Sequence, residues 1–450
     1  MAKSKYLTAP IPSEKMPTGM PYILANEGAE RFSFYGMSSI LVIFMTEHMM
    51  GHSGTLDVMS DKKAEAYFHF FNSAVYFTPF LGALISDIWL AKYRTIFYFS
   101  LLYCLGYLAL VLDITRLGLA GGLLLIAIGS GIIKPCVSAN VGDQFGQSNK
   151  HLIEKVYGWF YFSINLGAAI SMLLCPWLLD HYGPRMGFGV PAVFMVLATI
   201  AFWLGRWKFV HIPASGFDSV RQTLDKEAIR SLAKLCIIYV FVAMFWALFY
   251  QSQSAWVLQA KKMNLKWLGI TWLPAQLQFV NPALVLVMIP AFTYCIYPAA
   301  NKIFTLTSLR KITIGMFVTV LSFVVCGWIE TRIVAGDKPS IGWQFLAYVI
   351  LTAAEIMVSI TCLEFSYTQA PKKIKSFIMA AFLLSVSLGN AFTGVVNKVI
   401  ENPDGSSKLP GASYYWFFAV AMLVTAVLFI PVAKRYRAKS YIQDEAPAET

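Results

Sequence analysis

Charged residues are scarce in this chain. Only 13% of its 450 residues are Asp, Glu, Lys or Arg, whereas about 25% is usual in a soluble domain. Hydrophobic residues make up 57% and aromatic residues 15%, which is more apolar surface than a soluble protein of this length could bury. The composition argues against a soluble enzyme, a disordered scaffold and a nucleic-acid-binding protein, in spite of the net charge of +12.

Motifs of enzymes and ATP-driven pumps are absent too. The chain has no HExxH, no GxSxG in a strand–turn–helix setting and no GxxxxGK(S/T). Its seven cysteines lie in apolar stretches without a CxxC pair, which is typical of core residues rather than disulfides or metal ligands. We therefore expect no enzyme activity, no cofactor and no metal. An ion gradient, or the substrate's own gradient, has to drive any transport.

Long apolar runs dominate the chain instead. A helix needs about 20 mostly apolar residues to cross a bilayer. Three long apolar segments carry charge inside, at about 22–48, 118–142 and 340–367. Nine runs of at least 18 residues contain no charged side chain: 66–86, 95–112, 156–179, 186–205, 235–260, 267–301 (its helix placed near 276–300), 312–329, 376–397 and 409–433. The runs predict an all-α membrane protein with twelve transmembrane helices.

A polar connection near the middle divides these spans into six and six. Two six-helix halves are the plan of many alternating-access transporters. Tails and connections on the side of the N-terminus carry 23 of the 36 Lys and Arg residues, against 11 on the other side, which favours cytoplasmic termini. The predicted units are a cytoplasmic tail at 1–21, a six-helix bundle at 22–208, a cytoplasmic linker at 209–229, a second six-helix bundle at 230–435 and a cytoplasmic tail at 436–450.

The first span carries an unusual stripe of polar side chains. Glu27, Glu30 and Arg31 are spaced i, i+3 and i+4, so they share one helix face, and Tyr35 lies one turn beyond Arg31. Ions inside a bilayer are costly and indicate function or pairing. The stripe is either a self-neutralising group that ties the first span to a neighbour, or a cavity wall where a proton and an anionic group exchange partners.

Three other spans carry isolated ionisable side chains. Lys134, followed by Pro135, would either be neutral or need an anion, which a substrate or an acid on another helix could supply. Glu355 lies deep in its span and either takes up a proton, meets a cationic ligand or bonds Ser359 one turn away. His69 shares a face with Tyr76 and is either a structural residue or a proton carrier.

Other polar residues in the spans are weaker candidates. Each of them could line a cavity or bond another helix. They are Tyr161, Asn165, Gln251, Gln253, Asn281 and Asn390.

Several segments form an ordered set across the chain. Together they resemble the proton-dependent oligopeptide transporter (POT/PTR) family, a branch of the major facilitator superfamily, over about residues 22–433. The matching segments are Glu27-x-x-Glu30-Arg31-Phe-Ser-Phe-Tyr35-Gly36, Gly82-Ala-Leu-Ile-Ser-Asp87 with Lys92 and Arg94, Lys134-Pro135 with Asp143-Gln144-Phe145, Phe160-Tyr161-x-x-Ile164-Asn165-x-Gly167, Phe245-Trp246-Ala-Leu-Phe-Tyr250-Gln251, and Glu355 with Glu364-Phe-Ser-Tyr-Thr-Gln-Ala-Pro371.

The resemblance implies a site for a short peptide. Arg31 and Lys134 would face the carboxylate of the peptide, and Glu355 would face its amino group. Four further residues would lie beside the peptide: Tyr35, Tyr76, Asn165 and Asn281.

The resemblance also implies proton coupling through Glu27, Glu30, Glu355 and His69, the last matching a histidine of the animal peptide transporters. One departure weakens the carry-over, because Tyr250 stands where the family has an acid. Other departures are Phe34, Ser38 and Phe382.

The expected function is import of di- and tripeptides with protons, by alternating access. The peptide carboxylate would displace Glu27 or Glu30 from Arg31 or Lys134, and the released acid would take up a proton. Expected partners are peptides, protons and the lipid bilayer, with no nucleic acid and no obligate protein partner. The expected location is a cell membrane, in a bacterium the inner membrane. Alternatives are a transporter of the same fold for another small anion, such as nitrate or a conjugated metabolite, and a membrane receptor or assembly factor that does not transport.

Overall fold

The computed structural model describes residues 6–51, 53–214, 216–217, 226–369 and 375–436. Parts of the predicted linker at 209–229, the end of the segment 364–371 and nearly all of the predicted tail at 436–450 lie outside these residues.

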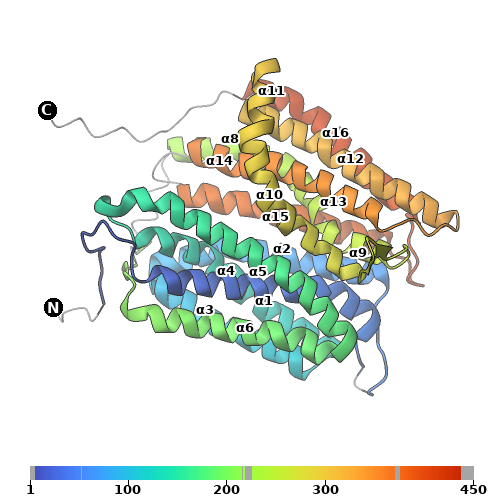
Figure 1. Cartoon of the computed structure of the whole chain (residues 1–450), viewed down its shortest axis with the longest axis horizontal. Helices are drawn as coiled ribbons and strands as arrows, with labels where there is room; N and C mark the ends of the chain where they lie inside the picture. The colour runs from blue at the N-terminus through green and yellow to red at the C-terminus, as the bar shows by residue number, and fades with distance from the viewer. Residues whose placement is uncertain (1–5, 52, 215, 218–225, 370–374, 437–450) are drawn as a thin grey trace.

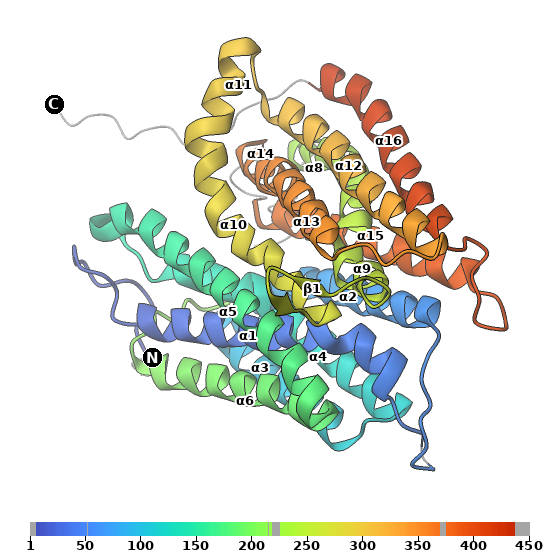
Figure 2. The same ribbon diagram turned by 45° about the vertical axis from the view of Figure 1, so that its right-hand side comes forward.

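Long helices form almost the whole structure (Figure 1). Helices α1 to α6 lie together on one side of the molecule, and α8 to α16 lie together on the other (Figures 1 and 2). The first group is called the N-half and the second the C-half. The helices of the N-half are α1 (Met20–Ile43), α2 (Asp61–Ile85), α3 (Lys92–Leu112), α4 (Arg116–Asp143), α5 (Ile153–Tyr182) and α6 (Pro184–Leu204).

Several spans of the C-half are broken into shorter helices. A short hairpin of two strands with two residues each, β1 (Lys266–Trp267) and β2 (Ile270–Thr271), connects two of these spans. The helices of the C-half are α8 (Lys226–Phe249), α9 (Ala255–Ala260), α10 (Val280–Ala291), α11 (Tyr297–Ile303), α12 (Ser308–Val334), α13 (Gly342–Glu355), α14 (Thr361–Gln369), α15 (Lys375–Ile400) and α16 (Ala412–Arg435). The first begins inside the stretch predicted as a linker.

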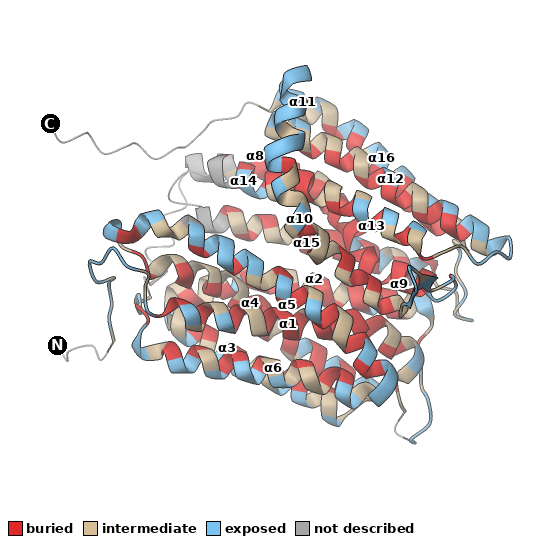
Figure 3. Cartoon of the chain, in the orientation of Figure 1, coloured by how far each residue is buried: buried red, intermediate tan, exposed pale blue. Residues whose placement is uncertain are grey.

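Eleven helical segments of the described chain are long and apolar enough to cross a membrane. The remaining long helix, α1, is 24 residues long but contains Glu27, Glu30 and Arg31, which lower its hydropathy. Large apolar side chains are exposed along the outside of the molecule, for example Leu105, Val196 and Leu321 at 55%, 45% and 55%. Exposure of this extent is expected where lipid covers the protein (Figure 3).

Short irregular turns interrupt three spans of the C-half. A tight (3₁₀) helical turn, Tyr250–Gln253, separates α8 from α9. A wide (π-helical) turn, Phe292–Ile296, follows Pro290 and separates α10 from α11. Another wide turn, Ile356–Ile360, begins directly after Glu355. Wide turns of this kind are frequent at functional sites.

Small residues let the helices around the first span approach closely. A Cβ added at Gly167 of α5 would lie 2.6 Å from the carbonyl oxygen of Gly28 on α1. A Cβ added at Gly131 of α4 would lie 1.7 Å from the Thr78 hydroxyl of α2. Any larger side chain at either position would push the helices apart. The first crossing places α1, with its charged stripe, against α5, and the second places α4 against α2.

Candidate substrate-binding site

Arg31 is the centre of a buried charged group on α1. Its Nε lies 2.7 Å from Glu27 Oε1 and 2.8 Å from Glu30 Oε2, and all three side chains are at most 9% exposed. The Ser130 hydroxyl of α4 donates to Glu30 Oε1 at 3.5 Å. The predicted helix-face stripe is therefore present, with both acids held by one guanidinium.

Lys134 lies next to this group without an acid of its own. Its ammonium is buried and has no hydrogen-bond partner, and no carboxylate of the described residues lies within 4.0 Å of it. It faces two aromatic rings instead, 4.1 Å from the ring centre of Tyr76 and 4.5 Å from that of Phe34. The alternative of an interhelical salt bridge is thus not what the described part of the chain shows. A buried ammonium of this kind is ready to accept an anion.

Tyr76 connects the N-half to the C-half. Its hydroxyl accepts a hydrogen bond of 2.6 Å from the hydroxyl of Tyr250, and the two rings meet edge to face. Tyr250 thus forms a neutral contact with Tyr76, and the ring of Tyr76 in turn contacts Lys134.

Glu355 lies on the C-half side of the same region. Its Oε2 accepts a hydrogen bond of 2.7 Å from Asn281 Nδ2, which also lies 3.1 Å from the Thr352 hydroxyl. The partner of Glu355 is therefore an amide on α10 rather than Ser359. No Lys or Arg of the described residues forms an ion pair with Glu355.

The two sides face each other closely enough to interact electrostatically. Tyr35 interacts with Arg31 and Tyr76 of the N-half and with Glu355 of the C-half. Lys134 interacts with all three charged residues of the α1 group. The structure thus brings together two bases on one side and a lone acid on the other, with tyrosine hydroxyls between them.

Two residues predicted for the site, Asn165 and His69, have their partners outside the charged group. Asn165 Nδ2 donates to the Tyr161 carbonyl oxygen of its own helix at 3.0 Å, which leaves one amide hydrogen for another partner. His69 is fully buried between the halves, with Nδ1 2.9 Å from Asn390 Oδ1 and Nε2 3.0 Å from the Ser254 hydroxyl. Neither nitrogen of His69 points freely into the charged group.

Three residues at the site escaped the sequence predictions. Ser130 contacts Glu30, Thr352 contacts Asn281, and Ser254 contacts His69. Serine and threonine are common in membrane helices and usually bond their own backbone, so nothing in the sequence distinguishes these three. No group of His, Cys, Asp or Glu in the described ranges is arranged to hold a metal ion.

Polar contacts between the halves gather toward one end of the molecule. This end, called the sealed end, carries the connections 49–60, 261–273, 335–341 and 401–411. Glu47 forms an ion pair with Lys261 there, and the Ser60 hydroxyl donates to Glu401 at 2.5 Å. Closer to the centre, Ser38 donates to Gln253, Gln278 donates to the Ser39 carbonyl oxygen, and Gln276 donates to that of Leu173.

Comparison with known proteins shows where this arrangement belongs. A sequence model described as PTR2, the POT family, matches residues 93–224 and 208–417, more than half of the chain. The chain belongs to the POT family. Its fold is that of the major facilitator superfamily, and it crosses the membrane many times.

Relatives in animals share about a third of their residues with this POT-family chain. Peptide transporter family 1 of Drosophila melanogaster is 34% identical over 375 residues, which are 72% of this chain and 49% of the relative. Solute carrier family 15 member 2 of Homo sapiens is 32% identical over 415 residues, which are 80% of this chain and 55% of the relative. The chain thus spans about half the length of the curated relatives it matches.

Solved structures match over nearly their whole length. The POT family transporter PepTSo aligns with a TM-score of 0.85 at 34% identity, covering 93% of this chain and 98% of that one. An auto-inhibited POT family peptide transporter aligns with a TM-score of 0.85 at 31% identity, covering 95% and 99%. A proton-dependent oligopeptide (POT) family transporter aligns with a TM-score of 0.78 at 34% identity, covering 91% and 100%.

Proposed function

We propose that this POT-family chain is a proton-coupled symporter that imports di- and tripeptides by alternating access, and that it is not an enzyme. The observation that carries the proposal is the buried ammonium of Lys134, which has no acid partner in the described chain and lies beside Arg31. Opposite these bases, the partner of Glu355 among the described residues is the amide of Asn281. A short peptide has a carboxylate and an ammonium at its two ends, so it fits a site with bases on one half and an acid on the other.

Charge balance in the N-half links the peptide to a proton. Glu27, Glu30, Arg31 and Lys134 together carry no net charge when all are ionised. A peptide carboxylate that joins them adds one negative charge in a region where an uncompensated charge is costly. Protonation of Glu27 or Glu30 removes this excess. The proton also supplies driving force, about 2.3 kcal/mol per 100 mV and about 1.4 kcal/mol per pH unit.

Each predicted residue keeps a role in the proposal. Arg31, Lys134, Tyr35 and the remaining amide hydrogen of Asn165 would bind the peptide carboxylate. Glu355 would bind the amino group once Asn281 gives way, and Tyr76 would line the space between. Glu27, Glu30 and Glu355, together with His69, would exchange the coupling protons, with no other cofactor.

We further propose that the sealed end faces the outside of the cell and that both termini lie in the cytoplasm. In a bacterium, the membrane that holds the chain would be the inner membrane. The excess of Lys and Arg on the side of the termini supports this orientation. The structure would then represent the state that is closed to the outside. The two bundles at 22–208 and 230–435 would rock about the site to open the sealed end.

Uptake by purified protein in liposomes tests the proposal. With an inward proton gradient, labelled dialanine should accumulate, and unlabelled di- and tripeptides should compete whereas nitrate and free alanine should not. Without a gradient, no accumulation should occur. If nitrate competes and dialanine does not, the chain transports a different anion. If no solute enters under any gradient, the chain is not a symporter.

A further inference from the structure

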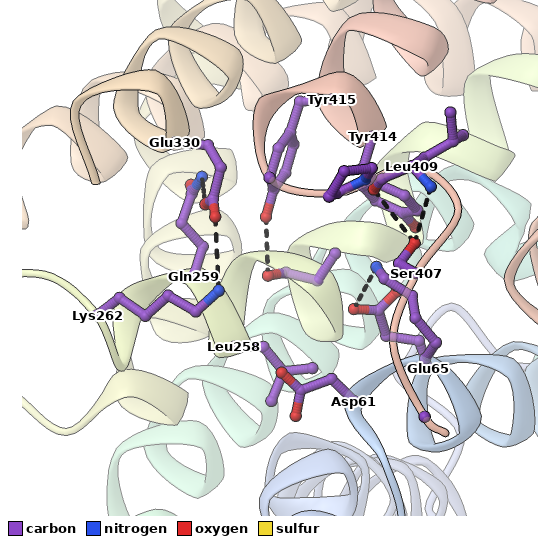
Figure 4. A pocket seen from close by; sticks show the side chains of 15 residues that line it. Asp61, Glu65, Leu258, Gln259, Lys262, Glu330, Ser407, Leu409, Tyr414 and Tyr415 are labelled. Carbon is purple, nitrogen blue, oxygen red and sulfur yellow. Dashed lines mark hydrogen bonds and ion pairs between the residues drawn. The ribbon is translucent and has the colours of Figure 1, made fainter. Parts of the chain in front are cut away.

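A cavity of about 270 Å³ lies between the halves at the sealed end (Figure 4). The first turns of α2 line it with Asp61, Lys62 and Glu65, and the C-half contributes Glu330 and Tyr414, among others. A space of this size is large enough for several water molecules. Two buried carboxylates, Glu65 and Glu330, thus reach water at an end of the molecule where the halves are closed.

The two carboxylates are held in different ways. Glu330 belongs entirely to the C-half, because Gln259 donates to it at 2.8 Å and Lys262 lies 3.5 Å away. Glu65 lies on the N-half, and its side chain is 3% exposed and 2.8 Å from Lys62 Nζ. The same ammonium lies 3.5 Å from the centre of the Tyr414 ring of the C-half. Of these two carboxylates, Glu65 is therefore the one that lies at a contact between the halves.

Polar side chains surround Glu65 where the two halves meet. The Tyr414 hydroxyl of α16 contacts the side chains of Glu65 and Asn397. Among the described residues, Oδ1 of Asn72, which lies beyond His69 on α2, is buried without a hydrogen-bond partner. Buried polar atoms are almost always satisfied, and ordered water is the usual partner where protein offers none.

Asn72 lies on α2 and Asn397 lies on α15, and these two helices run side by side. His69 of α2 bonds Asn390 of α15, and one turn further along α2 Ser73 bonds Ser387. The pairing is antiparallel, so residues before His69 on α2 lie beside residues after Asn390 on α15. Glu65 is about 6 Å from His69 along the helix axis, at 1.5 Å per residue. One or two bridging waters span such a distance.

The bonds of His69 allow it to bind a proton without losing a partner. Asn390 Nδ2 donates to the Val386 carbonyl oxygen, so Oδ1 faces His69 and Nδ1 carries a hydrogen. Nε2 then accepts from the Ser254 hydroxyl in the neutral ring. After protonation Nε2 donates to Ser254, whose hydrogen turns to the Tyr250 carbonyl oxygen at 3.5 Å.

From this geometry we propose that Glu65 is a further proton-binding site, which loads His69 from the sealed end. A proton from cavity water binds the Glu65 carboxylate and frees Lys62. It then passes through bridging water to the Ser254 hydroxyl, which gives its own hydrogen to His69 Nε2, so Glu65 becomes a carboxylate again and the ring becomes an imidazolium. The other charged and titratable groups that line the cavity are Asp61, Lys62, Lys262, Glu330, Tyr414 and Tyr415. The inference rests on the proposed proton-coupled function.

Transport at a series of external pH values tests the role of Glu65. Glu65→Gln should move the external pH of half-maximal dialanine uptake to lower pH by about one unit, a tenfold change in proton concentration. Peptide counterflow at equal pH on both sides should be unchanged, which shows that folding and peptide binding are intact. Glu65→Asp should keep the wild-type midpoint. The matched control is Glu330→Gln, which changes the other buried acid of the cavity and should leave the midpoint in place.

Different failures point to different errors. An unchanged midpoint in Glu65→Gln, or an equal shift in Glu330→Gln, would overturn the role of Glu65 while peptide import by the wild type stands. Absence of proton-driven uptake in the wild type would overturn the proposed function itself. Infrared difference spectra of the full chain between neutral and acidic pH give a readout without transport. They should contain a protonated-carboxyl band that Glu65→Gln removes, and its persistence in that variant would also overturn the inference.

Discussion

The ammonium of Lys134 lies 4.1 Å from the ring centre of Tyr76, whose hydroxyl bonds Tyr250 of the opposite half. The electron-rich face of the ring partly compensates the buried charge. It does so without neutralising it, so the ammonium stays available to an anionic ligand. The contact between the halves at this level is made by two neutral hydroxyls rather than by an acid and a base.

Lys134→Met should leave the fold intact and weaken peptide binding. A buried ammonium without an acid stabilises the protein little, and methionine has a similar volume and no charge to desolvate. The unfolding temperature should stay the same or rise. Affinity for dialanine should fall by about 10- to 100-fold, because a hydrogen bond to a charged group contributes about 1.5–3 kcal/mol.

Lys155→Met is the control for this change. Lys155 is exposed on α5 and lies over the ring of Trp159. Peptide uptake should be unaffected by its loss. Wild-type affinity in Lys134→Met would show that the ammonium does not meet the substrate.

Arg31→Gln should destabilise the protein as well as stop transport. The change leaves Glu27 and Glu30 buried without their base, and breaking a buried ion pair from one side costs about 3–5 kcal/mol. The double variant Arg31→Gln/Glu27→Gln should recover part of the unfolding temperature, because one of the two acids is then neutral. Neither variant should accumulate dialanine. Equal stability of the single and double variants would contradict the shared ion pairs.

Glu355→Gln should fold normally and lose preference for a free amino group. Its side-chain oxygen still accepts the hydrogen bond from Asn281, so the local structure is kept. In the wild type, dialanine should compete for uptake much better than N-acetyl-dialanine. The affinity of the variant for dialanine should be lower by about tenfold or more, since a charged contact of about 1.5 kcal/mol or more is lost.

Competition by the two peptides against a labelled tripeptide measures this preference. The two compounds should compete equally in the variant. If the variant still prefers dialanine, the amino group binds elsewhere in the site.

Reversing one charge at the sealed end should change how often this end opens. Lys261→Glu places a second acid against Glu47 in place of the ion pair. Because both side chains are partly exposed, the effect on free energy should be modest, about 1 kcal/mol or less. Spin labels at positions 56 and 407, in the two halves, should show a larger share of long distances in this variant. The exchanged pair Lys261→Glu/Glu47→Lys should restore the wild-type distribution, and a failure to do so would argue against a direct contact.

Local spacing was enough to predict part of the site. The i, i+3 and i+4 positions of Glu27, Glu30 and Arg31 place them on one face in any α-helix, and their pairing in the structure follows. The helical spans were equally predictable, because twenty apolar residues in a row have few stable alternatives in a bilayer. The wide turn after Glu355 was not predictable, since no proline or glycine marks it.

The sequence by itself determined the membrane-spanning helices, their grouping into two sets of six and the presence of costly charges within them. Only the tertiary structure decided which partners these charges have. Lys134 faces rings rather than an acid, His69 bonds Asn390 and Ser254, and Tyr250 bonds Tyr76. The physical reason is that such contacts depend on the register and closeness of helices far apart in the chain. That register comes from the packing of many apolar side chains, and no short pattern along one helix encodes it.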